Sequence, residues 1–134
     1  MNTFPLKIVT PDGIAFEGTA ESLTVRTTGG DIGILAGHMN CVAPLGMGRA
    51  TVLIDGAPRY GACIGGMVSV VNGKVTLVPT TFEWAEDIDA ARVEKSYALA
   101  QTILSNKTST KVDIALAEAR LKRALVRRSV ANSK

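Results

Sequence analysis

Aromatic residues are scarce in this chain of 134 residues, where Phe, Trp and Tyr together make up 4%. Aliphatic residues must therefore build the core, and a protein that stacks single-stranded nucleic acid on aromatic rings is disfavoured. One histidine and two cysteines offer no cluster with the spacing of a metal site. Cys41 and Cys63 both stand in apolar surroundings, which is typical of buried free thiols in a reducing compartment.

Long apolar runs are also missing. The longest stretch without a charged residue, Ile32 to Gly48, falls short of the roughly 20 apolar residues that a membrane-spanning helix needs. The first residues show no basic segment followed by an apolar run, so no signal peptide is predicted. We expect the protein to stay in the compartment where it is made.

Motifs of catalysis are absent as well. The chain contains neither a G-x-S-x-G nucleophile motif nor a phosphate-binding loop of the G-x-x-x-x-G-K-[ST] type. Gly46-Met47-Gly48 resembles the start of a dinucleotide fingerprint, but Thr51 stands where its third glycine belongs. We therefore expect a non-catalytic protein, while an enzyme with a pocket in the strand-rich part remains an alternative.

The first 83 residues have the pattern of short strands. Between Glu21 and Thr28 apolar and polar residues alternate, as in a strand with one buried face. Asp55-Gly56 and Asn72-Gly73 separate further apolar runs and are strong hairpin signals, because type I′ turns need positive φ at both central residues. The pattern predicts an antiparallel β-sandwich or barrel over residues 1–83.

The period changes in residues 84–134, where Ala is the most frequent residue. Asp87 is the predicted N-cap of a first helix. A short polar break at 105–110 precedes a second helix, so the two form an antiparallel helical hairpin. Each helix carries apolar stripes: Val93, Tyr97, Ala100 and Leu104 on the first helix; Val112, Leu116 and Ala119, with Ile114, Leu121 and Leu125 beside them, on the second. Helices this short are marginal in water when undocked, so the hairpin is expected to be a conditional element.

The positive charge is concentrated at the end of the chain. Residues 107–134 carry 8 basic and 2 acidic side chains, whereas residues 1–106 carry 7 basic and 10 acidic ones. A basic segment of this kind keeps a small nucleic-acid-binding or adaptor module as an alternative. The acidic remainder of the chain and its few aromatic residues disfavour nucleic acid.

Five segments, in order along the chain, resemble one family, the epsilon subunits of bacterial F-type (F1Fo) ATP synthases. They are Leu6 to Gly13, Gly30 to His38, Gly65-Gly66, Asn72 to Thr76 and Ala85 to Arg92. The family has G-[DE]-[IL]-G-I-L-P-G-H in the second segment and A-E-D-I-D-x-x-R in the last. The chain departs from the family at Ala36, where Pro is usual, at Met39-Asn40, where Ala-Pro is usual, and at Thr80 to Phe82.

The resemblance implies a rotor subunit on the central stalk that couples rotation to ATP synthesis. The β domain would contact the gamma subunit and the c-ring, the latter through Asp31, Ile32, His38, Met39 and Asn40. The hairpin would inhibit ATP hydrolysis by contacting the alpha and beta catalytic subunits through Arg120, Lys122, Arg123, Arg127 and Arg128. No nucleic acid is implied. The location would be peripheral, on the cytoplasmic face of the bacterial inner membrane, reached only through the complex.

Some members of this family bind ATP between the sandwich and the hairpin, and no other cofactor is required. The matching positions are Glu83, Ile88, Asp89, Arg92, Arg123 and Arg127. Arg123 and Arg127 are four residues apart and share a helix face, so both guanidinium groups could clamp phosphates. Asp89 and Arg92 fit an ordinary helix-surface pair equally well, and Val93 stands where the nucleotide-binding pattern prefers Ala.

Overall fold

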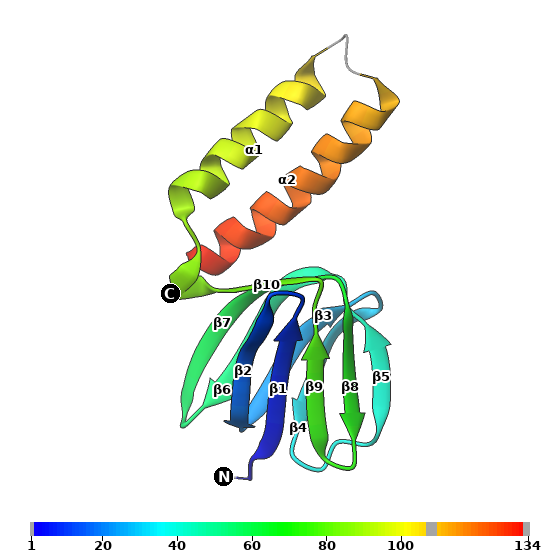
Figure 1. Ribbon diagram of the computed structural model, residues 1–134, viewed down its shortest axis with the longest axis vertical. Helices are drawn as coiled ribbons and strands as arrows, with labels where there is room; N and C mark the ends of the chain where they lie inside the picture. Colours follow the sequence, from blue (N-terminus) through cyan, green and yellow to red (C-terminus); the bar gives the residue numbers. More distant parts are fainter. Residues whose placement is uncertain (1, 107–109, 133–134) are drawn as a thin grey trace.

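A computed structural model describes residues 2–106 and 110–132, so the middle of the predicted polar break, 107–109, lies outside the described residues. The described chain has two parts, a body of strands and a pair of helices standing on one end of it (Figure 1). The strands are β1 Phe4–Thr10, β2 Gly13–Ala20, β3 Ser22–Thr27, β4 Gly30–Leu35, β5 Cys41–Pro44, β6 Met47–Ile54, β7 Ala57–Ile64, β8 Met67–Val71, β9 Lys74–Val78 and β10 Thr81–Trp84.

The strands form two five-stranded sheets, with orders β2-β1-β9-β8-β5 and β10-β7-β6-β3-β4. The predicted β-sandwich is confirmed, and the pairings are antiparallel except that between β1 and β9, which run parallel. Leu6 pairs with Val75 and Ile8 with Leu77, so the first strand is held between its hairpin partner and a strand almost seventy residues later. This long-range pairing joins the β1–β2 hairpin to the other three strands of the first sheet.

The two predicted hairpin turns have the backbone that they require. Asp55 and Gly56 have φ values of 50° and 78°, and Asn72 and Gly73 have 50° and 82°. Positive φ at both central residues is the mark of the type I′ turn, whose twist matches that of the flanking strands. These turns set the register of β6 with β7 and of β8 with β9.

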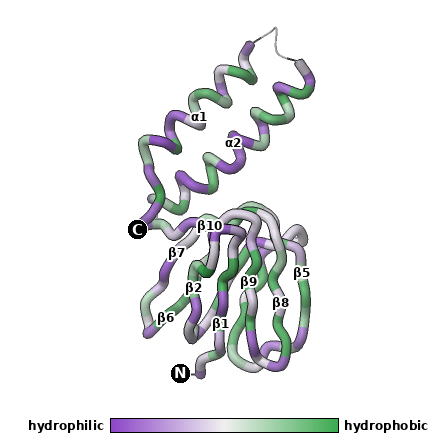
Figure 2. The backbone as a smooth tube through the Cα atoms, viewed as in Figure 1, coloured by the Kyte–Doolittle hydropathy of each residue, from purple (hydrophilic) through white to green (hydrophobic). Residues whose placement is uncertain are grey.

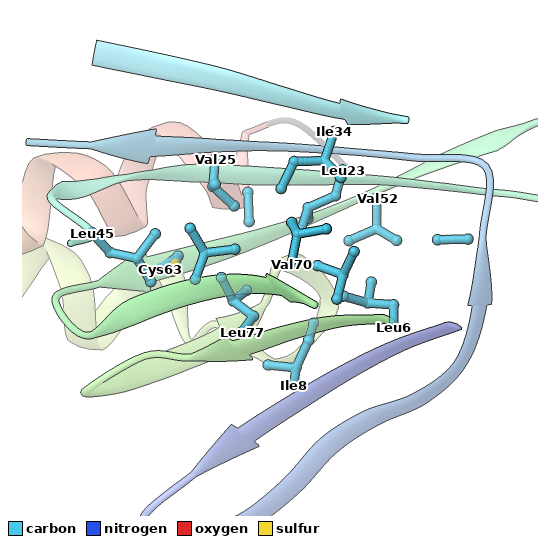
Figure 3. Close-up of a cluster of buried hydrophobic side chains, with 14 of the residues drawn as sticks. Leu6, Ile8, Leu23, Val25, Ile34, Leu45, Val52, Cys63, Val70 and Leu77 are labelled. Carbon is cyan, nitrogen blue, oxygen red and sulfur yellow. The ribbon is translucent and has the colours of Figure 1, made fainter. Parts of the chain in front are cut away.

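Aliphatic side chains from the inner faces of both sheets fill the sandwich (Figure 3). Leu23 and Val25 of β3 are fully buried, as the alternation predicted, and they face Leu77 and Val70 of the other sheet. Trp84 is the last residue of β10 and is 6% exposed within this core, where its indole Nε1 donates to the carbonyl oxygen of Ala15 at 3.1 Å. The predicted boundary between residues 83 and 84 stays a prediction, but Trp84 packs with the strands.

The helices are α1, Ala90–Ser105, and α2, Lys111–Ala131, which confirms the predicted hairpin. The prediction that Asp87 caps the first helix is wrong. Asp87 lies in a short 3-10 turn, η1 Ala85–Asp87, and the N-cap is Asp89, whose Oδ1 accepts from the backbone N–H of Arg92. Thr110 caps α2 in a capping box with Asp113.

Small residues make the seam between the helices. Ala100 of α1 and Ala117 and Ala124 of α2 are buried, whereas Val112 and Leu116 are 67% and 65% exposed. The apolar stripe through Val112 and Leu116 therefore lies on the exposed surface of the hairpin. Alanine carries no side chain beyond Cβ, so helices that meet at alanine positions can approach closely, and the larger residues are left on the outer surface.

A second, smaller core joins the hairpin to the sandwich, and it is distinct from the sandwich core. Its buried members come from β7, the η1 region and both helices: Ala62, Ala85, Ile88, Val93, Ala124 and Val130. Hydrophilic residues run along much of both helices (Figure 2). Neither helix in the described part of the chain is long and apolar enough to cross a membrane.

Candidate functional site

A cavity of about 370 Å³ lies where the hairpin meets the sandwich. Strands β7 and β10 form one wall, and helices α1 and α2 form the other. Its lining residues are Ile64, Thr81, Glu83, Arg92, Ser96, Arg120, Arg123, Ala124 and Arg127. Four of the six positions predicted to bind ATP, Glu83, Arg92, Arg123 and Arg127, are thus brought together.

Four arginines give the cavity a strong positive charge. Arg120, Arg123 and Arg127 follow one another at spacings of three and four residues and so share one face of α2, while Arg92 comes from the first turn of α1. Glu83 is the acidic residue among the lining side chains. A site with this excess of guanidinium groups favours phosphate, because each guanidinium presents several donors in a planar fork.

Glu83 pairs with Arg127 across the junction between strand and helix. The Nη2 atom of Arg127 donates to Glu83 Oε2 at 3.1 Å, and Nε lies 2.8 Å from Oε1. The Nε atom has no hydrogen bond of good geometry within the described residues, so attraction at that atom is by charge. The Arg127 and Glu83 side chains are 21% and 37% exposed, which makes this pair the least hydrated of the ion pairs found in the described chain.

The other two predicted ATP positions do not line the cavity. Ile88 is 4% exposed in the core that joins the hairpin to the sandwich. The carboxylate of Asp89 caps α1 by accepting from the backbone of Arg92. The interpretation of Asp89 and Arg92 as a side-chain pair is therefore replaced by a helix cap.

The residues predicted to contact catalytic subunits divide into groups. Arg120, Arg123 and Arg127 face the cavity, and Lys122 is exposed. Arg128 braces the hairpin: it binds Glu94 through two hydrogen bonds of 2.8 and 2.9 Å, and its guanidinium lies 4.0 Å from the centroid of the Tyr97 ring. The bond to Glu94 raises the pKa of Arg128.

Sequence reasoning missed several lining residues. Ser96 stands one turn after Arg92, and this spacing of four could have indicated it. Arg120 stands three residues before Arg123, a spacing that also places it on the cavity face. Ile64 and Thr81 carried no signal, because their place depends on where the hairpin docks.

The loop after β4 gathers three of the residues predicted to face the c-ring. His38 Nδ1 donates to the carbonyl oxygen of Met39 at 2.8 Å, and Asn40 Oδ1 accepts from the backbone N–H of Asn72 at 2.8 Å. The second bond ties the loop to the turn between β8 and β9, at the end of the sandwich away from the helices (Figure 1). Met39 is 77% exposed.

Asp31 and Ile32 do not join this group. Asp31 lies at the other end of β4, paired with Arg26 at 2.9 Å, and it borders a second cavity beside Leu125 of α2. Ile32 is half-buried against the sandwich core. The length of β4 separates both from His38, so the predicted set is split between the two ends of the sandwich.

That second cavity, of about 480 Å³, is larger but less suited to an anion. Its cationic groups are Arg26, which pairs with Asp31, and Arg49, which lies 4.8 Å from the centroid of the Tyr60 ring. The smaller cavity is therefore the better candidate for phosphate, because Arg92, Arg120 and Arg123 have no side-chain partner within the described residues.

The two thiols differ in environment. Cys63 is buried, and burial raises its pKa from 9.0 to about 12. Cys41 is half-buried, with its Sγ 4.0 Å from His38 Nδ1. Within residues 2–106 and 110–132, no group of three or more His, Cys, Asp or Glu side chains could hold a metal ion.

Two family models match the chain. That for the beta-sandwich domain of the ATP synthase delta/epsilon chain matches residues 3–85, and that for its long alpha-helix domain matches residues 86–132. An ATP synthase epsilon chain of Ruminococcus albus is 42% identical over 135 residues, covering 100% of both chains. One of Bacillus cytotoxicus is 40% identical over 134 residues, again covering 100% of both.

Solved structures share the fold. A chain of the Euglena gracilis mitochondrial ATP synthase, in an OSCP/F1/c-ring assembly, superposes with a TM-score of 0.83 at 21% identity, covering 98% of this chain and 82% of that one. A chain from the central stalk and c-ring of the Tetrahymena thermophila mitochondrial enzyme superposes with a TM-score of 0.61 at 12% identity, covering 95% of both.

Proposed function

The chain belongs to the delta/epsilon chain family of ATP synthases, as an epsilon chain, and we propose from this that it is a non-catalytic rotor subunit whose helical hairpin regulates ATP hydrolysis. The sandwich is the part that turns with the central stalk. The hairpin is the part that changes position. The alternative of a nucleic-acid-binding or adaptor module is not supported, since the two family models together match residues 3–85 and 86–132.

The observation that carries this division of roles is the separation of the two cores. The sandwich core is closed without a residue from either helix. The hairpin rests on it through a small cluster in which alanines are frequent, such as Ala62, Ala85 and Ala124. This cluster is separate from the sandwich core, so the hairpin can leave the sandwich while the sandwich stays folded.

Two exposed surfaces of the sandwich suit the rotor partners. The outer face of the first sheet carries an apolar groove of about 270 Å³, lined by Val42, Met67, Ser69, Thr76 and Val78, which fits a packed contact with the gamma subunit. At the end away from the helices, Leu35 and Met39 are 63% and 77% exposed. This end fits the c-ring, with His38 and Asn40 holding the loop in shape.

The hairpin regulates through two positions. Docked on the sandwich, it turns Arg120, Arg123 and Arg127 toward the cavity and leaves the catalytic subunits free. Extended, it presents the same guanidinium groups to acidic surfaces of the alpha and beta subunits and blocks hydrolysis. Charge complementarity would then set the specificity and rate of that docking.

ATP is the regulatory ligand of the docked state in this proposal. The cavity exists only while α2 lies against β7 and β10, so an anion bound there stabilises docking by its difference in affinity for the two states. Each tenfold ratio of affinities shifts the equilibrium by about 1.4 kcal/mol. The subunit reaches the cytoplasmic face of the bacterial inner membrane only through the complex.

Removing the hairpin tests the proposal. A chain ending at Trp84 keeps every strand, and it is expected to join the complex and preserve coupling of hydrolysis to ion pumping while raising the rate of ATP hydrolysis. The measurements are co-purification with the gamma subunit, pumping into inverted vesicles and steady-state hydrolysis. Unchanged hydrolysis would contradict the brake, and loss of gamma binding would contradict the rotor role.

A further inference from the structure

The segment that joins the sandwich to the hairpin begins as part of the sandwich. Trp84 packs in the sandwich core, where its ring meets the rings of Phe16 and Phe82 edge to face, with centroids 6.1 and 4.9 Å away. The chain then forms η1, Ala85–Asp87, which leads to α1 (Figure 1). Up to Trp84, the chain is therefore held by contacts within the sandwich.

Arg59 of β7 extends this attachment into η1. Trp84 pairs with Gly61 of β7, and continuing that antiparallel register places Glu86 opposite Arg59. The guanidinium carbon of Arg59 lies 3.8 Å from the centroid of the Trp84 ring. Its Nε donates to Glu86 Oε1 at 2.9 Å, and its Nη2 donates to the same oxygen. We call Arg59, Trp84 and Glu86 the Arg59 clamp, in which stacking on the indole adds to a half-exposed ion pair.

After η1 the contacts belong to the helices. Ile88 packs with Val93 and Val130 in the core that joins the hairpin to the sandwich. The N–H of Ile88 donates the last hydrogen bond of η1, to Ala85, whereas the carbonyl oxygen and Oδ1 of Asp89 accept the first hydrogen bonds of α1.

The link between Ile88 and Asp89 can turn without breaking these bonds. Ile88 has ψ of 125° and Asp89 has φ of −81°, and both residues lie in the broad extended region of the backbone map. Rotation about these two angles leaves the N–H of Ile88 with η1 and the oxygens of Asp89 with α1. The two residues therefore have the geometry of a hinge.

Resting on the movement of the hairpin proposed above, we propose that the Arg59 clamp keeps residues 85–87 on the sandwich in both positions of the hairpin, so that the helices turn about Ile88 and Asp89. A hinge of two residues limits how far and in which directions the helices can reach. Without the clamp, the open state would have a flexible link of five residues, 85–89.

Loss of the clamp is expected to act through the open state. In the docked state Ala85 and Ile88 are buried against the helices, so η1 keeps its place there without Arg59. In the open state, lengthening the flexible link from two residues to five makes the return to the docked state about fourfold less favourable through chain entropy. Arg59→Gln should therefore raise the ratio of open to docked chains about fourfold.

Pairs of spin labels show where the chain bends. In the full chain carrying Cys41→Ser and Cys63→Ala, one label is attached at Thr19→Cys on β2. The second is attached at Asp87→Cys in η1 or at Lys95→Cys on α1, and all three labelled positions are exposed. Pulsed electron paramagnetic resonance measures the distance between the labels in the free chain and in the assembled complex with inhibited hydrolysis, and circular dichroism checks that each variant is folded.

The hinge predicts a different result for each label pair. The distance from Thr19 to Lys95 should differ between the free chain and the complex, whereas the distance from Thr19 to Asp87 should be the same in both. In Arg59→Gln, the distances from Thr19 to Asp87 should spread in the complex. Arg59→Lys should fall between, because Lys keeps the charge but not the planar fork of donors.

Lys7→Gln is the matched control. Lys7 forms an exposed ion pair with Glu17, at 3.5 Å between β1 and β2, so this change also removes the positive member of a surface pair on the sandwich but leaves the Arg59 clamp intact. It should change neither label distance and should leave the ratio of open to docked chains within about twofold, as expected for an exposed pair.

The outcomes separate the clamp from the movement itself. If the distance from Thr19 to Asp87 changes as much as that from Thr19 to Lys95, the bend lies before Asp87 and the hinge is refuted. If Arg59→Gln gives the same distances as Lys7→Gln, Arg59 is not a clamp. A distance from Thr19 to Lys95 that is identical in the free chain and the complex would refute the hairpin movement of the proposed function, and the hinge with it.

Discussion

Val130→Ala tests whether the hairpin opens independently of the sandwich. Val130 lies at the C-terminal end of α2, is fully buried, and packs in the junction core with Ala62 and Ile88. The change removes two carbon atoms, which at about 0.8 kcal/mol per buried methylene group costs about 1.6 kcal/mol, and the cavity left behind adds a few tenths. We expect a loss of about 2 kcal/mol in the free energy of docking.

A matched control separates burial from helix propensity. Val112→Ala makes the same substitution on the same helix, at a side chain that is 67% exposed. Both variants gain about the same helix propensity, since Ala is the better helix former at either site. The difference between them therefore isolates burial, and about 2 kcal/mol corresponds to roughly a 30-fold change in the docking equilibrium.

Amide hydrogen exchange measures this opening directly. We expect the amides of α1 and α2 to exchange roughly 30-fold faster in Val130→Ala than in Val112→Ala, while the amides around Val52 and Leu77 in the sandwich core keep their rates. Equal hairpin rates in the two variants would refute the role of the junction core. Sandwich amides accelerated as much as the hairpin amides would show that both parts open as one unit.

Two further predictions concern the sandwich itself. Trp84→Phe should lower the free energy of unfolding by about 1–2 kcal/mol in urea titrations, because the carbonyl oxygen of Ala15 loses its donor. For the same reason a chain ending at Glu83 should be less stable than one ending at Trp84. Equal urea midpoints for these two chains would contradict the prediction. In native protein at pH 8, iodoacetamide should modify Cys41 and spare Cys63. Because the pKa of Cys63 rises from 9.0 to about 12 on folding, the free energy of unfolding should fall as pH rises between those values, where only the unfolded thiol ionises. A Cys63→Ala variant with the same slope in this range would contradict that assignment.

Local signals predicted most of the sandwich. Asp55-Gly56 and Asn72-Gly73 specify their turns through the backbone conformation of two residues, so the turn type depends little on the rest of the chain. The alternation of apolar and polar residues around Leu23 follows from the single buried face of the strand. The parallel pairing of β1 with β9 had no local signal, because strands far apart in the sequence make it. The pairing depends on how the β1–β2 hairpin docks on β9, and a short stretch of sequence carries no information about that docking.

The helix faces were harder to predict. Large apolar residues such as Val112 and Leu116 marked an apolar stripe, but the buried positions of α2 are Ala117, Ala124 and Val130. Close approach of two helices favours small side chains. Alanine is less hydrophobic than leucine, so a search for the most hydrophobic face of a helix does not select the alanine positions. The N-cap was misplaced for a related reason: Asp87 and Asp89 are both good caps, and only the 3-10 turn before Ile88 decides between them.

The candidate site was predicted in part. Of the six positions that the resemblance named, the structure places four around one cavity: Glu83, Arg92, Arg123 and Arg127. Arg120 was assigned to an outer contact, although its spacing from Arg123 fits the same face. The resemblance grouped Asp31 with His38 in one ring-facing segment, whereas the extended strand β4 carries its two ends apart.

The alanine seam has a consequence for what the hairpin can do once it is released. Its closed form is held by side chains that lose little when they meet water, while Leu99, Val112 and Leu116 already face outward. These large apolar side chains of the two helices therefore make no buried contact in the isolated chain. A neighbouring protein that covers these side chains would add apolar contacts that the isolated hairpin does not make, so the extended helices would be stabilised by their partner.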